Sequence, residues 1–169
     1  MTERFTFFAR NPSPFSQWYE DAPFELDGIR FATAEHYMMF RKGQLFGAPD
    51  AMLQQILAAT PRGARALGRQ VPGFKEQIWR PVARTIVAAG NYAKFTQNPP
   101  ALWALLETEG TTLVEAAPWD RVWGIGLAAN DPRSQQRDTW LGLNWLGHTL
   151  TDVRDTLLRA IRAGTAAPV

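Results

Sequence analysis

Apolar and polar residues alternate near the N-terminus in a pattern that predicts short strands. Residues 5–9 form a β-like run that ends before Pro12 and Pro14, which cannot continue a hydrogen-bonded ladder. Residues 24–26 and 29–31 alternate on either side of Asp27-Gly28, a dipeptide suited to a type I′ turn. The sequence therefore predicts a small N-terminal β-hairpin region.

Helical spacing dominates the rest of the chain. Thr33 is the expected N-cap of a helix from residue 34 to about 42 that stops at Gly43, and Thr60-Pro61 predicts the cap and first residue of another. Further helices are expected over residues 49–59, 74–96 and 102–107, and from near Asn144 onward. Residues 112–116 are expected to form a strand. The fold class is therefore α+β, mainly α-helical.

The helix expected over residues 74–96 carries an apolar stripe and an internal proline. Pro81 either kinks this helix or marks its true start, and Pro99-Pro100 is expected to end the region. The stripe consists of Ile78, Val82, Ile86 and Ala89.

The length of the chain indicates one domain over residues 1–163, followed by a disordered tail over residues 164–169.

Composition excludes several kinds of chemistry. The 169 residues contain no cysteine and two histidines, so disulfides, thiolate metal sites and cysteine nucleophiles are impossible, and we expect neither a protein-held metal nor a cofactor. No apolar run approaches the ~20 residues of a membrane-spanning helix, and the N-terminus lacks a secretory pattern, so a cytoplasmic protein without membrane contact is expected. The net charge of +2 is too small to predict long-range capture of a polyanion.

Glu35 and Lys42 are the first candidates for chemistry. They lie seven residues apart in an expected helix, almost two turns, and so project from the same face with Met38 and Met39 between them. An acid and an amine on one face can supply an acid/base and a nucleophile. The alternative is two solvated charges on a surface helix. His36 lies on another face, and a structural role is the simpler interpretation.

Two aromatic segments complete the candidates. Residues 15–19 include Trp18, on which a base could stack, and Arg69 is one of several arginines available to phosphates. Residues 119–126 combine Asp120 and Trp123 with Gly124, in a loop of the kind that lines ligand sites. The alternative is that Trp119 and Trp123 merely fill the core. Together these features indicate a nucleotide-processing enzyme without specifying the reaction.

Ten short blocks, spread along most of the chain, carry a resemblance to a known family. Taken in order and at their spacing, they resemble the NADAR, or YbiA-like, N-glycosidases. The blocks are Phe15-Ser16-Gln17-Trp18, Ala34-Glu35-His36-Tyr37 with Lys42, Leu67-Gly68-Arg69, Trp79, Lys94-Phe95, Leu113-Val114-Glu115, Asp120, Trp123-Gly124-Ile125-Gly126, Leu143-Asn144-Trp145-Leu146-Gly147 and Val153-Arg154.

The resemblance implies a single YbiA-like domain that cleaves a bond between a ribose carbon and a base nitrogen. It implies Glu35 as acid/base and Lys42 as an amine that traps the opened ribose as a Schiff base, best served if desolvation or a cation such as Arg41 lowers its pKa. The other residues expected to hold the substrate are Trp18, Arg69, Trp79, Asp120, Trp123, Gly124 and Asn144.

The resemblance implies two substrate classes. One is ADP-ribosylated guanine in a nucleotide or DNA, which suggests functional pairing with an ADP-ribosyltransferase toxin, and the other is a ribosylamino-pyrimidine phosphate of riboflavin biosynthesis. The arginines available to a diphosphate favour the first. Met38-Met39 and the long stretch 127–143 depart from the commonest family pattern and bear on substrate choice. Two other hypotheses are a non-catalytic ADP-ribose reader and a general nucleic-acid-binding module.

Overall fold

The computed structural model describes residues 3–10 and 12–165, and these form two compact units. The central unit is the continuous segment Gln17–Asn98. The terminal unit combines Met1–Ser16 with Pro99–Val169. Pro99-Pro100, expected to end the helical region, lies at the second boundary. The single domain over residues 1–163 stays a prediction.

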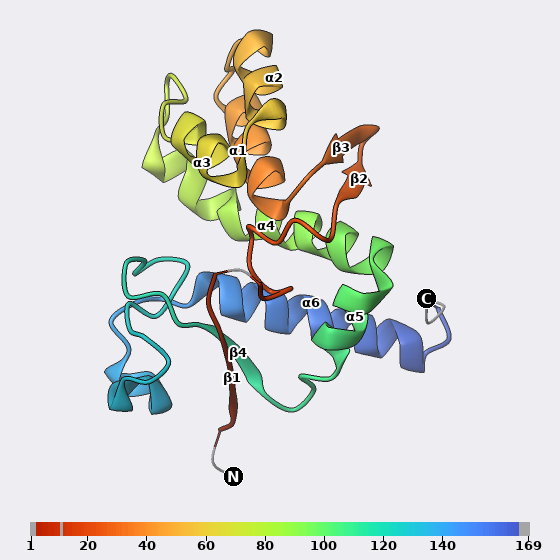
Figure 1. The fold of residues 1–169 in the computed structure, drawn as a ribbon, viewed down its shortest axis with the longest axis vertical. Helices are drawn as coiled ribbons and strands as arrows, with labels where there is room; N and C mark the ends of the chain where they lie inside the picture. The colour runs from red at the N-terminus through yellow and green to blue at the C-terminus, as the bar shows by residue number, and fades with distance from the viewer. Residues whose placement is uncertain (1–2, 11, 166–169) are drawn as a thin grey trace. The chain divides into compact units, whose positions relative to one another are not determined.

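The central unit is a β-hairpin followed by four helices, and α1 packs against α2, α3 and α4 (Figure 1). Asp27 and Gly28 have positive φ angles of 54° and 74°, which a type I′ turn requires, so the predicted hairpin is confirmed. Its elements are β2 (Phe24–Leu26), β3 (Ile29–Phe31), α1 (Ala34–Leu45), α2 (Asp50–Ala58), α3 (Pro61–Gly68) and α4 (Glu76–Gln97).

Helix α1 begins where the sequence predicts and ends later. Thr33 caps it by accepting a hydrogen bond from the backbone N–H of His36. The predicted stop at Gly43 is wrong, because this glycine is a packing contact inside the helix: a Cβ there would lie 2.6 Å from Leu53 Cδ2 on α2. The chain turns instead at Gly47, whose φ is 69°.

Helix α4 buries a face one residue away from the predicted stripe. Ile78 and Val82 are 45% and 36% exposed. The buried face runs through Trp79, Ala83, Val87 and Gly90, because small residues there let α1 approach: a Cβ on Gly90 would overlap the Tyr37 ring. Pro81 lies inside the helix and does not start it.

The terminal unit joins both ends of the sequence through a two-stranded parallel sheet. Strand β1 (Phe5–Phe8) pairs with β4 (Thr112–Glu115), the two lying side by side in Figure 1, and α6 packs on β4. Both strands and the start of the last helix confirm the predictions, whereas the prolines 99 and 100 also begin a helix. The remaining elements are α5 (Pro99–Leu106), the 3-10 turns η1 (Pro132–Gln135) and η2 (Arg137–Thr139), and α6 (Trp145–Arg162).

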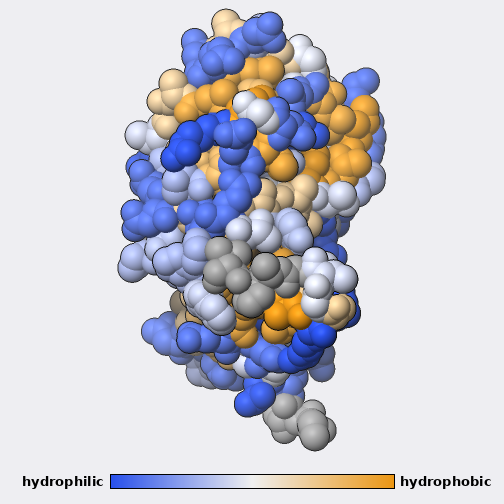
Figure 2. All heavy atoms as spheres, turned by 90° about the vertical axis from the view of Figure 1, so that its right-hand side faces the viewer, coloured by the Kyte–Doolittle hydropathy of each residue, from blue (hydrophilic) through white to orange (hydrophobic). Residues whose placement is uncertain are grey.

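The surface mixes apolar and polar side chains. On the face in Figure 2, orange hydrophobic atoms reach the surface between blue hydrophilic ones, and apolar atoms normally form more than half of a folded surface. Among the described residues, no helix combines the length and the apolar character needed to cross a membrane. Residues 164 and 165 of the predicted tail form a turn after α6, with φ 66° at Gly164, and residues 166–169 lie outside the described residues.

Candidate functional site

Glu35 lies in the first turn of α1, in the central unit. Its side chain is buried, with the residue 6% exposed. Its backbone N–H, which a helix of its own cannot satisfy in the first turn, donates to the carbonyl of Gln17 at 2.9 Å. The loop before the hairpin therefore fixes the backbone that carries this carboxyl group.

Lys42 lies two turns further along α1, beside two aromatic rings. Its Nζ is 4.1 Å from the ring centroid of Phe74 and 5.9 Å from that of Trp79. Trp79 is buried on α4, whereas Phe74, just before α4, is half-exposed and packs on Phe46 with a centroid distance of 5.3 Å. The amine is thus half-buried against apolar surface.

Burial is the main cause that lowers the pKa of Lys42 below its ordinary value. The charge of Arg69 lowers this pKa further, whereas Glu76 and Glu35 raise it. The expectation that Arg41 is the neighbouring cation is wrong, because Arg41 turns to Asp27 at 3.5 Å. The cation beside Lys42 is Arg69, at the C-cap of α3.

In the central unit, three other predicted residues therefore act on Lys42: Glu35 and Arg69 through their charges and Trp79 through its ring. An amine with a lowered pKa can act as a nucleophile, a buried carboxyl group can exchange protons, and a guanidinium can meet a phosphate. The interpretation of Glu35 and Lys42 as two merely solvated charges does not fit their burial. Sequence reasoning missed Phe74 and Glu76, for which the only signal is an apolar residue and an acid at a helix start.

Trp18 also belongs to the central unit, where it is half-buried. The aromatic segment treated as one loop in the sequence spans the unit boundary. Phe15 packs on Phe8 of the terminal unit with a centroid distance of 5.7 Å, whereas Gln17 bonds α1 and α4 of the central unit. A stacking role for Trp18 stays a prediction.

His36 has the structural role that the sequence favours. It is 1% exposed, and its Nε2 lies 2.8 Å from the carbonyl oxygen of Ala59. A carbonyl can only accept, so Nε2 carries the proton and Nδ1 is free to accept from the Thr33 hydroxyl at 2.8 Å. Both ring nitrogens are therefore occupied in holding α1.

The predicted residues of the loop 119–126 lie in the terminal unit. Asp120 Oδ1 accepts from the backbone N–H groups of Val122 and Trp123 at 2.9 and 2.8 Å, so this carboxylate shapes the loop. A Cβ on Gly124 would lie 2.9 Å from that of Ala117, so only glycine fits this turn. Trp119 does not fill the core: it is 54% exposed, under the guanidinium of Arg10 at 4.2 Å.

Trp123 and Asn144 are tied to α6 of the same unit. The Trp123 ring packs on Trp145 at a centroid distance of 5.6 Å. Asn144 is buried at φ 50°, its Oδ1 accepts from the N–H of Glu115 at 3.0 Å, and its Nδ2 donates to the carbonyl of Leu113 at 2.9 Å. Its amide therefore connects α6 to β4, and a binding role for Asn144 stays a prediction.

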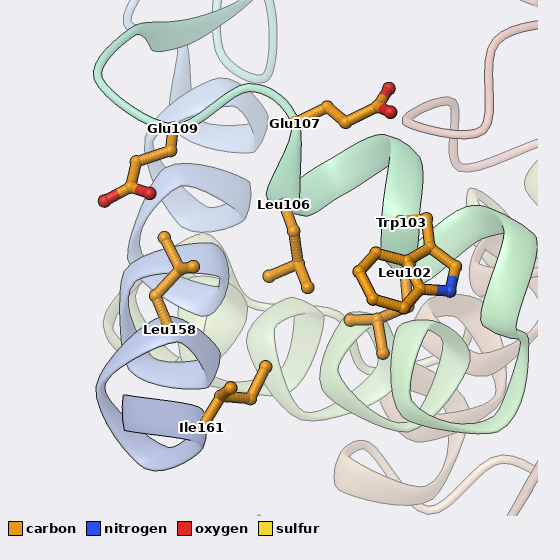
Figure 3. Close-up of a pocket in the computed structure, with 7 residues that line it drawn as sticks. All are labelled: Leu102, Trp103, Leu106, Glu107, Glu109, Leu158 and Ile161. Carbon is orange, nitrogen blue, oxygen red and sulfur yellow. The ribbon is translucent and has the colours of Figure 1, made fainter. Parts of the chain in front are cut away.

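A cavity of about 340 Å³ lies between α5 and α6 of the terminal unit (Figure 3). Its wall is apolar, with Glu107 and Glu109 at one side in the figure. None of the residues predicted for chemistry lines it. Within the part of the chain that the structure describes, no three His, Cys, Asp or Glu side chains are grouped to hold a metal ion. The other lining residues are Leu102, Trp103, Leu106, Leu158 and Ile161.

Comparison with known proteins decides the family. Residues 6–158 match the model of the NADAR domain. The chain belongs to the NADAR family. Among curated proteins, this NADAR chain is 39% identical over 145 residues to N-glycosidase R617 of Acanthamoeba polyphaga mimivirus, covering 83% of this chain and 85% of that protein. It is 34% identical over 146 residues to protein irg-1 of Caenorhabditis elegans, covering 85% of this chain and 69% of the relative.

A third relative is the chloroplastic riboflavin biosynthesis protein PYRR of Zea mays, 31% identical over 144 residues. The match covers 81% of the NADAR chain but 21% of that longer protein. Among solved structures, the NMR structure of the E. coli protein YbiA is similar with a TM-score of 0.74 and 25% identity, covering 99% of this chain and 91% of YbiA. The predicted YbiA-like α+β fold is confirmed.

Proposed function

We propose that this NADAR protein is an N-glycosidase that removes ADP-ribose from ADP-ribosylated guanine in nucleic acid. The observation that carries the proposal is the placement of Lys42, an amine with a lowered pKa beside two aromatic rings, two turns from the buried Glu35 on one helix. The similarity to a mimivirus protein named N-glycosidase supports the reaction class.

In the proposed reaction, water replaces the base at the ribose carbon. Glu35 gives a proton to the departing base nitrogen as the bond from that nitrogen to C1′ breaks. The neutral Lys42 amine attacks C1′ and gives a proton to the Glu35 carboxylate, which passes that proton to the ring oxygen as the ring opens to a Schiff base. Water then adds to C1′ and gives a proton to Glu35, the Lys42 amine leaves with that proton as the C1′ hydroxyl returns one to Glu35, and the sugar closes again. The scheme needs no metal, so a chelator should leave the rate unchanged.

The charge beside the amine favours ADP-ribose over a smaller sugar. Arg69 lies close enough to Lys42 to lower the pKa of Lys42 and is itself exposed, so its guanidinium is available to a diphosphate. Trp18 and Trp79 are the central-unit indoles assigned to the substrate. The binding roles expected for Asp120, Trp123, Gly124 and Asn144, which belong to the terminal unit, stay predictions.

The second candidate function is hydrolysis of ribosylamino-pyrimidine phosphates. It is favoured by the similarity to the maize protein PYRR, whose name places that protein in riboflavin biosynthesis. The same Glu35 and Lys42 would serve, since both reactions break a bond between C1′ and nitrogen. The two functions differ in the number of phosphates that Arg69 meets.

The test is release of base from the two substrates side by side, followed by chromatography with mass detection. An ADP-ribosylated guanosine oligonucleotide and a ribosylamino-pyrimidine phosphate are each mixed with the wild type, Glu35→Gln and Lys42→Ala. Matched controls are Glu25→Gln and Arg30→Gln, which remove one charge each from exposed positions of the hairpin. We expect release from the oligonucleotide by the wild type and both controls, and a loss of at least about 100-fold in the two site variants.

Release from the pyrimidine substrate alone would establish the second function instead. Tight ADP-ribose binding by calorimetry without release would indicate a non-catalytic reader. Binding to unmodified DNA with steep salt dependence would indicate a general nucleic-acid-binding module. Full rates in both site variants would show that the two roles are assigned wrongly.

A further inference from the structure

One face of α4 holds the segment that leads into the hairpin. Asn91 and Asn98 contact residues 17 and 23 of that segment, and the Lys94 ammonium lies 5.7 Å from the Tyr19 ring centroid between them. Asn91 and Lys94 of α4 and its C-cap Asn98 recur at intervals of three and four, so they lie on one side of the helix. The segment is therefore fixed at several points along its length.

Asn91 and Asn98 repeat one hydrogen-bonding pattern two turns apart. Each Nδ2 donates to the carbonyl four residues earlier on α4, from Asn91 to Val87 at 2.9 Å and from Asn98 to Lys94 at 2.7 Å. Each Nδ2 also donates to the segment, from Asn91 to Gln17 Oε1 at 2.8 Å and from Asn98 to the Pro23 carbonyl at 2.9 Å. We call these two side-chain links the Asn91 tether and the Asn98 tether.

The Asn91 tether has only one orientation. Both acceptors, the Val87 carbonyl and Gln17 Oε1, require a donor, so Nδ2 faces them and the Asn91 amide cannot be flipped. In consequence Asn91 Oδ1 and Gln17 Nε2 are buried with no partner among the described residues. A buried polar atom without a hydrogen-bond partner destabilises the fold, which calls for a compensating role.

The residue held by this tether is the one that fixes Glu35. The Gln17 side chain bonds Asn91, and the Gln17 carbonyl accepts the backbone N–H of Glu35 at 2.9 Å. Asn98 has no such link, since it bonds the carbonyl of Pro23, whereas the Glu35 N–H donates to the carbonyl of Gln17. We propose that Asn91 is a positioning residue that acts through Gln17 to hold the acid/base Glu35 in place. The catalytic part of this inference rests on the proposed function.

The consequence for the reaction is specific. Loss of the Asn91 bond frees Gln17, and the N-terminal turn of α1 then loses the acceptor for the Glu35 N–H. Substrate contacts at Lys42 and Arg69 are unaffected, so the rate of the chemical step falls while KM is retained. A residue that only stabilises the unit would lower the fraction folded without changing kcat per folded molecule.

The test compares Asn91→Ala with Asn98→Ala, with Gln17→Ala as a second route to the same bond. Hydrogen exchange of the Glu35 amide, measured by NMR, reports positioning without any substrate. We expect a loss of at least about tenfold in protection of this amide in Asn91→Ala and Gln17→Ala, and no loss in Asn98→Ala. On the substrate that the wild type cleaves, we expect kcat to fall about tenfold in the same two variants with KM within about twofold. The double variant should lose no more than either single one.

Unchanged Glu35 protection in Gln17→Ala would overturn the proposal, even if Asn91→Ala fails to fold. Equal loss of protection in Asn98→Ala would also overturn it, because the effect would then belong to the whole segment. If the wild type cleaves neither substrate, the proposed function fails, while the Glu35 exchange rates still decide whether Asn91 positions this residue.

Discussion

The Nζ atom of Lys42 lies 4.1 Å from the centroid of the Phe74 ring, and two charges of opposite sign, Arg69 and Glu76, act on it. Arg69 lowers the pKa of Lys42 and Glu76 raises it. We therefore expect Glu76→Gln to lower the Lys42 pKa and Arg69→Gln to raise it. Titration of the lysine Cε signal by NMR measures both.

The same two variants should move the pH dependence of the rate. Catalysis by a neutral amine becomes faster as the pH rises through the pKa of that amine. The rising limb of the curve of rate against pH should therefore shift to lower pH in Glu76→Gln and to higher pH in Arg69→Gln. Glu107→Gln, an acid of the terminal unit, is the control and should leave the limb in place. Shifts of the same sign in the two variants would contradict the arrangement.

Lys94 should make stability depend on pH. It is fully buried, and burial lowers its pKa from 10.5 to about 7. Between these values the unfolded chain binds a proton that the folded chain lacks, so the free energy of unfolding rises with pH, approaching about 1.4 kcal/mol per pH unit mid-window. Below pH 7 both states are protonated and the slope vanishes.

Lys94→Met should abolish this slope, as measured by urea unfolding at several pH values from 6 to 10.5. Lys75→Met removes an exposed ammonium just before α4 and is the control, which should retain the slope of the wild type. If the free energies of unfolding of the wild type and of Lys94→Met change equally with pH between 6 and 10.5, Lys94 has an ordinary pKa.

Gly90→Ala should destabilise the central unit, although alanine favours a helix by up to about 1 kcal/mol. The added Cβ overlaps the Tyr37 ring, and overpacking of a core typically costs about 1–3 kcal/mol. Thermal unfolding should show a net loss. The loss should shrink in a Tyr37→Leu background, and a Gly90→Ala variant more stable than the wild type would refute the close approach of α4 to α1.

Asn144 should contribute to stability in two separable ways. Asn144→Gly removes its two hydrogen bonds to β4 and should cost about 2 kcal/mol. Asn144→Ala loses the same two bonds but keeps a Cβ in the left-handed conformation at φ 50°, which glycine relieves and which alanine tolerates less well than asparagine, so it should cost roughly 1 kcal/mol more than Asn144→Gly. Denaturant unfolding measures both. If alanine is tolerated better than glycine, the backbone conformation assigned to this residue is wrong.

Local signals in the sequence predicted the parts of the fold that local chemistry decides. Asp27-Gly28 specified the turn through φ, and Thr33 and Thr60 specified helix starts through their hydroxyl groups. Parallel pairing of β1 with β4 could not be predicted, because neither strand carries a signal for a partner so distant in sequence. The buried face of α4 was mispredicted because large apolar residues stay exposed while Ala83 and Gly90 are buried by the approach of α1.

In the candidate site too, the sequence predicts what depends on local structure and not what depends on the packing of distant segments. Helical periodicity placed Glu35 and Lys42 on one face, a local property of α1. The cation that acts on Lys42 is Arg69 from α3, not its neighbour Arg41, because the packing of helices decides which charges meet. Likewise, the tether from Asn91 to Gln17 joins residues far apart in sequence, and no spacing rule could reveal it.

The pairing of β1 with β4 has a consequence for synthesis on the ribosome. Phe5 is made about a hundred residues before its register partner Thr112, and the whole of Gln17–Asn98 emerges in between. The nascent strand Phe5–Phe8, rich in phenylalanine, therefore lacks its partner strand until Thr112–Glu115 has been made. During this interval the chain carries an unpaired apolar strand, the kind of segment through which chains pair with one another and aggregate.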